Sequence, residues 1–145
     1  MFYGQHQFSI NEKNRMQIPT ALRELFTGKA VITQGFERNI LVLPVNVFES
    51  LAKLVMALNI TDPLARSLQR LLLGNASYCE IDGLGTIEIP VSLKEFSGIT
   101  AEGILVGQGR YVEAWSPANW LKQELDLQDA EANSQRFVSL NLSGL

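Results

Sequence analysis

The sequence predicts a mainly β, α+β fold in which two tandem repeats share one core and helices lie at the periphery. The first observation is a period of two in short apolar runs such as 8–10 and 16–18, which is typical of half-buried strands. The second is a repeat, because Ile18-Pro19 recurs as Ile89-Pro90 at an offset of 71 residues. The third is composition: 46% of the 145 residues are apolar and 19% are charged, which allows a buried core.

The repeating unit is a strand, a polar loop, a second strand, a proline and a short helix. In the first copy, Pro19 ends the second strand because proline cannot donate a ladder hydrogen bond. The segment 20–26 then places Leu22, Leu25 and Phe26 at helical spacing. Since 8–25 aligns with 79–96, we expect the second copy to fold in the same way.

Later apolar runs complete four short strands in each half. Val31-Ile32 matches Ile104-Leu105, and the run 38–43 matches 110–115. The turn residues Gln34-Gly35 in the first half and Gly107-Gln108-Gly109 in the second join these runs, which predicts two hairpins.

Helical patterns follow each repeat. The run 45–58 keeps helical spacing, and Asp62-Pro63 begins a second, leucine-rich helix that Gly74 ends. Ser116-Pro117 begins a matching helix after the second repeat. From Gln128 onward, small, polar and acidic residues predict a fraying helix and a mobile tail.

These patterns divide the chain into four parts. They are a first repeat (1–50), connecting helices (51–75), a second repeat (76–122) and a C-terminal helix end with a mobile tail (123–145). Because four short strands are too few to bury a core alone, we expect both halves to form one intertwined β-barrel about a pseudo-twofold axis. The expected inward residues are Phe8, Ile10, Ile18, Val31, Leu41, Ile81, Ile87, Ile89, Leu105 and Val112.

The charge is unevenly distributed along the chain. The net charge is −3, yet residues 1–44 carry five cations against three acids, and the remainder carries seven cations against twelve acids. No apolar run approaches the roughly 18 residues that a membrane span needs. The N-terminus shows no export signal, and the single cysteine suits a reducing cytoplasm, so we expect a cytoplasmic protein.

Enzyme motifs are weak in this sequence. His6 is the only histidine and Cys79 the only cysteine, so we expect no catalytic residues, no metal site and no cofactor. Glu80, Asp82 and Glu88 could supply a carboxylate pair, but a solvated strand face explains them better. The glycine-rich 83–88 runs into a strand, whereas a dinucleotide loop leads into a helix.

The loop 11–15 offers a better candidate, a binding site. It projects Lys13 and Arg15 from a tight turn with Asn11 and Asn14 beside them. Arginine can donate a planar fork of hydrogen bonds to guanine edges or phosphates, and lysine provides a point charge for the backbone. An ordinary solvated turn explains the spacing equally well. A second basic pair, Arg66 and Arg70, fits a solvated or subunit-facing helix side better than a DNA site.

The loop also carries a family resemblance. Residues 11–19, Asn-Glu-Lys-Asn-Arg-Met-Gln-Ile-Pro, resemble the signature of AbrB-type (SpoVT-AbrB) DNA-binding domains. Two copies in one chain, with 70–76 between them, resemble the MraZ family. The resemblance implies tandem swapped-hairpin repeats and a cytoplasmic, nucleoid-associated transcriptional regulator. It further implies a ring-shaped homo-oligomer that binds direct repeats of double-stranded DNA in the promoter of the division and cell-wall gene cluster, including its own gene.

This chain departs from the family signature in both loops. Asn11 replaces the signature aspartate and Asn14 its glycine, but asparagine tolerates a left-handed turn, so the first loop should keep its shape. In the second loop, Thr86 stands where arginine is expected, and no cation is present. We therefore assign DNA contact to the first loop, through Lys13, Asn14, Arg15 and Asn11, and a structural role to the second.

A rival hypothesis is an antitoxin-like protein-binding module. It dimerises through the same barrel and wraps another protein with the acidic, low-complexity segment 124–145.

Overall fold

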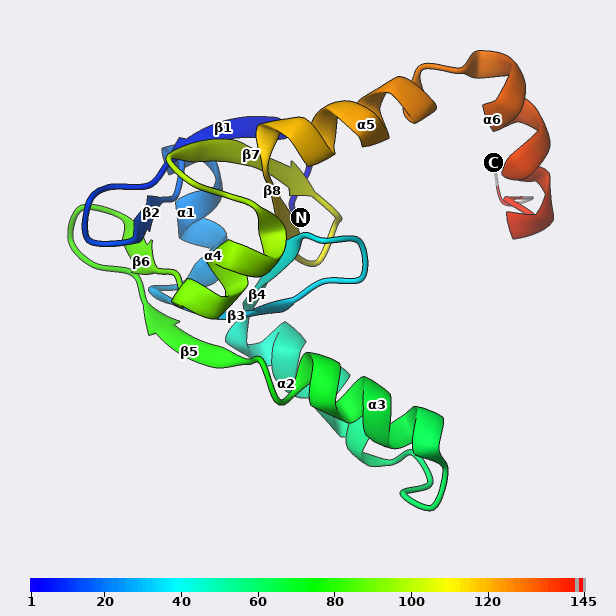
Figure 1. The fold of residues 1–145 in the computed structure, drawn as a ribbon, viewed down its shortest axis with the longest axis horizontal. Coiled ribbons are helices and arrows are strands. Elements are labelled where there is room, and N and C mark those ends of the chain that lie inside the picture. The colour runs from blue at the N-terminus through cyan, green and yellow to red at the C-terminus, as the bar shows by residue number, and fades with distance from the viewer. Residues whose placement is uncertain (143, 145) are drawn as a thin grey trace.

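The computed structural model describes residues 1–142 and 144 (Figure 1). The first half contains β1 (Gln5–Ser9), β2 (Arg15–Gln17), α1 (Thr20–Arg23), the 3-10 turn η1 (Glu24–Phe26), β3 (Lys29–Gln34), β4 (Ile40–Pro44), α2 (Val45–Met56) and α3 (Pro63–Leu72). The second contains β5 (Ser77–Glu80), β6 (Thr86–Glu88), α4 (Val91–Ser97), β7 (Glu102–Gly107), β8 (Val112–Trp115), α5 (Pro117–Leu127), α6 (Ala130–Arg136) and η2 (Val138–Leu140). The predicted order of four strands with a helical turn between the second and third is confirmed in both halves.

The strands of the two halves are intertwined. A six-stranded antiparallel sheet has the order β1-β7-β8-β4-β3-β5, and β2 pairs with β6 in a separate ribbon. The first strand of each half thus pairs with the third strand of the other half. If each strand is replaced by its counterpart in the other half, the strand order of the sheet reads the same from the opposite edge. The strand pairing therefore has the same twofold symmetry as the tandem repeat.

The strand registers locate the pseudo-twofold axis. In the ribbon, Met16 lies opposite Ile87, its own counterpart at the repeat offset. In the large sheet, Leu41 lies opposite Glu113, which is likewise its counterpart. An axis through these two pairs relates the repeats, as the sequence predicts.

A fully closed barrel is not formed, so the barrel prediction holds only in part. Each hairpin that should close it, β1–β2 and β5–β6, splays apart; in the first, a single bridge joins Ile10 to Met16 beyond the turn. The backbone hydrogen bonds next to each turn close the loop, as from the Asn11 N–H to the Arg15 carbonyl and from the Asp82 N–H to the Thr86 carbonyl. They do not continue as a ladder between the two strands of the hairpin. Two equivalent gaps result, one lined by Gln7, Phe8, Ser9, Gln17 and Pro19 and the other by Tyr78, Cys79, Glu80, Glu88 and Pro90.

The main core lies between the ribbon and the large sheet. Seven of the predicted inward residues are buried there, namely Phe8, Ile10, Ile18, Ile87, Ile89, Leu105 and Val112, and Ile81 packs against them partly buried. The prediction is wrong for Val31 and Leu41, which are buried on the opposite face of the sheet beneath α2 and α3. Because helices cover that outer face, β3 and β4 are apolar on both sides, and alternation cannot reveal which side faces the main core.

Helices cover the outer face of each hairpin in the large sheet. The helices α2 and α3 pack on β3–β4, and α5 packs Trp120 against Trp115 and Val106 of β7–β8. Asp62 and Ser116 cap α3 and α5 as predicted, since each side chain accepts a hydrogen bond from a first-turn N–H. Among the described residues, no helix has the length and apolar character that crossing a bilayer requires.

The C-terminal segment leaves the body of the molecule. Helix α6 follows α5 after a short break, capped by Asp129, and extends away from the sheet (Figure 1). The predicted mobile tail includes Ser143 and Leu145, which lie outside the described residues; mobility of the segment stays a prediction.

Candidate nucleic-acid interface

The candidate site consists of two equivalent loops at one end of the molecule, 11–14 after β1 and 81–85 after β5 (Figure 1). Asn11 shapes the first loop, because its Oδ1 accepts hydrogen bonds from the N–H groups of Lys13 and Arg15 at 2.9 and 3.1 Å. Asp82 does the same in the second loop for Leu84 and Thr86. The Asn11 oxygen is therefore occupied in holding the turn.

Both loops have a residue in the left-handed conformation at the equivalent position of the repeat. Asn14 has φ +58° and its counterpart Gly85 has φ +79°. The prediction that Asn14 can replace the signature glycine in a left-handed turn is confirmed, because asparagine is one of the few side chains that tolerate this conformation.

Backbone hydrogen bonds between the two repeats hold the two loops side by side. The Asn14 carbonyl accepts a hydrogen bond from the Ile89 N–H, and the Gly85 carbonyl accepts one from the Ile18 N–H, both at 2.9 Å. Each loop is thus tied to the strand end of the other repeat. The pair forms one rigid edge on which an exposed side chain can be presented with little loss of backbone entropy.

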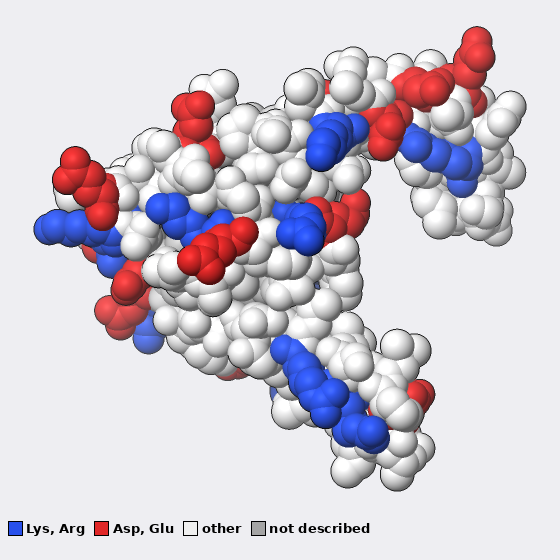
Figure 2. All heavy atoms as spheres, in the orientation of Figure 1, with Lys and Arg blue, Asp and Glu red and all other residues white. Residues whose placement is uncertain are grey.

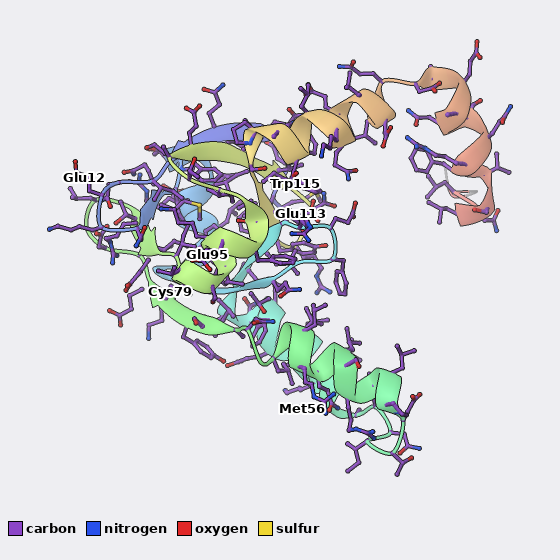
Figure 3. All side chains as sticks on the ribbon, in the orientation of Figure 1. Glu12, Met56, Cys79, Glu95, Glu113 and Trp115 are labelled. Carbon is purple, nitrogen blue, oxygen red and sulfur yellow. The ribbon has the colours of Figure 1, made fainter. Side chains whose placement is uncertain are left out.

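Lys13 is the cation at the exposed tip of this edge. Its side chain is exposed, and its ammonium makes no hydrogen bond or ion pair with the part of the chain that the structure describes. The counterpart of Lys13 in the second loop is Leu84, which is 77% exposed. Glu12 points outward beside the first loop (Figure 3), and cationic and acidic atoms are mixed at this end of the molecule (Figure 2).

Arg15 does not project from the tip, so the sequence-based placement is wrong for this residue. Its Nε donates to Thr86 Oγ1 at 2.8 Å, its Nη2 donates to the Thr86 carbonyl at 3.1 Å, and Nε lies 3.4 Å from an Asp82 carboxylate oxygen. The side chain is 27% exposed. The ribbon pairing brings the acceptors of the second loop next to β2, and a sequence offset of 71 residues does not reveal this contact.

Asp82 is held as a carboxylate by the same cluster. Hydrogen bonds from the Thr86 N–H and hydroxyl, with a smaller contribution from Arg15, lower the pKa of Asp82. The second loop therefore contributes a fixed negative charge to the edge and restrains the guanidinium of the first loop.

Two further cations lie against the loops, and the sequence did not predict either of them as a site residue. Lys94 of α4 donates to Asn14 Oδ1 at 2.9 Å. Arg23 of α1 donates to the Ile18 carbonyl and packs so close to Gly85 that an added Cβ there would lie 2.1 Å from the guanidinium carbon. The sequence contains a signal that could have indicated both residues, because Arg23 aligns with Lys94 in the repeat and both are cations. Each cation packs against the loop of the other half.

Two other groups with raised pKa values are Glu113, beside Trp115, and Cys79, which lines the same gap as Arg15 and Asp82. Burial raises the pKa of Glu113, which lies beside Trp115 (Figure 3) and accepts hydrogen bonds from its indole and from Gln108. Burial also raises the pKa of the Cys79 thiol and so disfavours its thiolate form. The described residues contain no group of three or more histidine, cysteine or carboxylate side chains that could hold a metal ion.

Comparison with known proteins shows which family this chain belongs to. A family model described as "MraZ protein, putative antitoxin-like" matches the chain twice, over residues 1–71 and 72–140. The chain belongs to the MraZ family. The double match corresponds to the two intertwined repeats, so the tandem MraZ domains of this chain are also its two structural halves.

Curated members of the MraZ family are similar to this chain over most or nearly all of their length. A protein of Thermomicrobium roseum is 38% identical over 141 residues, which is 97% of this chain and 99% of that protein. A protein of Nitrosomonas europaea is 40% identical over 148 residues, 99% of this chain and 98% of that protein. One of Herpetosiphon aurantiacus is 36% identical over 83% of this chain and 84% of its own. All three are named transcriptional regulator MraZ.

Proposed function

We propose that this protein is a sequence-specific, DNA-binding transcriptional regulator and not an enzyme. Its target would be the promoter of the division and cell-wall gene cluster, including its own gene, where it acts as a repressor. It would bind double-stranded DNA at direct repeats as a ring-shaped homo-oligomer, in the cytoplasm and associated with the nucleoid. Membership of the MraZ family and the names of the relatives support this proposal.

The observation that carries the proposal is the exposed Lys13 on a rigid edge. One lysine adds little affinity, since a single phosphate contact is screened at physiological salt. A homo-oligomer repeats the loop, and each further loop binds at a high effective concentration once the first is engaged. Repetition thus explains how a chain with net charge −3 could bind DNA.

The loop residues would divide the work. Lys13 would contact phosphate directly, and Asn11 would shape the turn through the two N–H groups that it holds. Asn14 would set the left-handed turn and position Lys94 beside the edge. Arg15 would reach a base or phosphate only after its guanidinium leaves Thr86 and Asp82.

A gel shift against the DNA upstream of the gene tests the proposal. A discrete complex should persist at moderate salt, and log affinity should fall linearly with log salt concentration, because bound phosphates release counterions. A matched duplex of shuffled sequence is the control. Equal affinity for both duplexes would contradict sequence-specific recognition.

Asp82→Asn is expected to strengthen DNA binding several-fold. The change removes the negative charge beside Arg15, while an asparagine in this place can still hold the turn, as Asn11 does in the first loop. Binding isotherms at two salt concentrations measure the effect.

The matched control is Glu49→Gln on α2, which alters the net charge equally but lies far from the loops. If both variants raise affinity by the same factor, the gain comes from overall charge and the restraint of Arg15 has no role.

A second candidate function is the antitoxin-like protein-binding module. The observation that favours it is the segment 124–145, where Leu125, Val138 and Leu140 are exposed. Deleting 124–145 separates the two ideas: binding of a short single-site duplex should survive, because the loops lie at the other end of the molecule. Capture of a partner protein should be lost.

A further inference from the structure

Leu84 lies at the tip of the second loop, for which the sequence alone indicated a structural role. Its side chain is 77% exposed, and it is the counterpart of Lys13 in the repeat. Both of its neighbours are glycines, Gly83 and Gly85, so the leucine stands alone at the end of the turn. Turn geometry favours glycine, asparagine, aspartate and serine and does not require a leucine. Neither the core nor the turn therefore accounts for this side chain.

The backbone of Leu84 is fixed on both sides. Its N–H donates to Asp82 Oδ1 at 3.1 Å, and its carbonyl accepts a hydrogen bond from Gln17 Nε2 at 2.8 Å. Because Gln17 belongs to β2, the tip of the second loop is tied to the first half of the chain. The leucine is thus presented in a fixed place, and a contact through it costs little backbone entropy.

The symmetry of the fold places Leu84 on the same edge as Lys13. The axis that relates the repeats runs from the large sheet through the ribbon of β2 and β6, and it exchanges the two loops. The loops lie side by side at the ribbon end of the molecule (Figure 1). A duplex that lies across the axis at this end and reaches Lys13 therefore also reaches Leu84.

The charges around Leu84 permit this approach. Asp82 is the only acid in the loop 81–85, and its carboxylate lies 3.4 Å from Arg15 Nε, which offsets its charge. The guanidinium of Arg23 packs against Gly85 on the other side of the leucine. A phosphate near the second loop would therefore meet balanced charges and not an acidic surface.

The chemistry of leucine limits what it can recognise on DNA. Its side chain neither donates nor accepts hydrogen bonds, so it cannot read the polar groups of the base edges. The apolar group that the major groove presents is the C5-methyl of thymine. The minor groove is about 6 Å wide and does not admit two loops side by side, whereas the major groove is about 12 Å wide and admits a two-stranded ribbon.

We propose that Leu84 reads a thymine of the target site by contact with its C5-methyl group in the major groove, while Lys13 contacts a phosphate nearby. This inference rests on the proposed DNA binding and adds the second loop to it as a determinant of sequence specificity. A protein partner fits this tip less well. The core of a protein interface is depleted in charge, but the leucine has no apolar neighbour in its loop and lies among charged groups.

Replacing thymidine by deoxyuridine tests the contact, because it removes the C5-methyl group alone. Each thymine of a short single-site duplex from the upstream DNA is replaced in turn, and binding isotherms give the ratio of affinities. The wild type should lose about fourfold in affinity at one thymine, which is the contribution of one buried methyl group. Leu84→Ala should bind the parent duplex more weakly and should show no loss at that thymine.

Leu84→Lys copies the lysine of the first loop into the second. It should raise affinity and steepen the salt dependence by about 0.9 in slope for an added phosphate contact, yet abolish the preference for thymine over deoxyuridine. A leucine that served only the shape of the loop would not give this combination. Leu64→Ala on α3 is the matched control, because Leu64 is 76% exposed and lies away from the loops (Figure 1). Its thymine preference should equal that of the wild type.

Three outcomes overturn the assignment. The first is a wild type that binds the duplex with equal affinity when any thymine is replaced, and the second is a thymine preference that Leu84→Ala retains. The third is loss of self-association in Leu84→Ala, measured by light scattering, with the thymine preference intact, which would place Leu84 in a protein contact. A wild type that binds no upstream duplex would instead refute the proposed DNA binding itself, so the two failures are distinguishable.

Discussion

Lys13→Glu is expected to weaken binding to the upstream DNA by at least about tenfold and to make its salt dependence shallower, by about 0.9 in slope for each lost phosphate contact. The side chain is exposed at the tip of the rigid loop edge, and the change replaces attraction to phosphate by repulsion. In an oligomer the loss recurs at every engaged loop, so the measured effect multiplies. Binding isotherms between about 50 and 200 mM salt give both quantities.

Arg110→Glu is the matched control. It changes the net charge equally, is exposed, and lies in the turn between β7 and β8, at the opposite end of β7 from the loops. Lys13 is a cleaner test than Arg15, because a glutamate at position 15 would face Asp82 and disturb the second loop. Equal losses for Lys13→Glu and Arg110→Glu would remove the loop from the proposed interface.

Phe26→Ala is expected to lower the free energy of unfolding by about 3–5 kcal/mol. Phe26 is 1% exposed in the main core, and its ring centroid lies 4.9 Å from that of Phe2. Truncation removes apolar contacts and leaves a cavity that the intertwined strands cannot close. Urea unfolding at one fixed protein concentration measures the midpoint shift, and the concentration must be fixed because an oligomer unfolds with a concentration-dependent midpoint.

Phe36→Ala provides the comparison within the same chain. Phe36 lies in the turn between β3 and β4 and is 65% exposed, so its truncation should change stability by less than about 1 kcal/mol. A similar loss for both variants would mean that Phe26 does not anchor the core. Unfolding at an unchanged slope in urea would confirm that both variants keep the native fold.

The local pattern of the sequence determined most of the fold. Three local signals predicted the helices and strands: the alternation in the short strands, the strand ends at Pro19 and Pro90, and the helix caps at Asp62 and Ser116. Each signal depends on neighbouring residues alone. The repeat also predicted the pseudo-twofold relation, since two similar sequences that share one core are expected to pack symmetrically. The left-handed turn at Asn14 followed from the chemistry of one side chain.

Only the tertiary structure decided which surfaces and side chains are available for binding. The sequence presented Lys13 and Arg15 as equals, but the pairing of β2 with β6 brings Thr86 and Asp82 to Arg15 and leaves Lys13 exposed. Val31 and Leu41 faced α2 and α3 rather than the main core, because strands covered on both faces show no alternation. These outcomes depend on contacts between residues far apart in the chain, which local pattern does not encode.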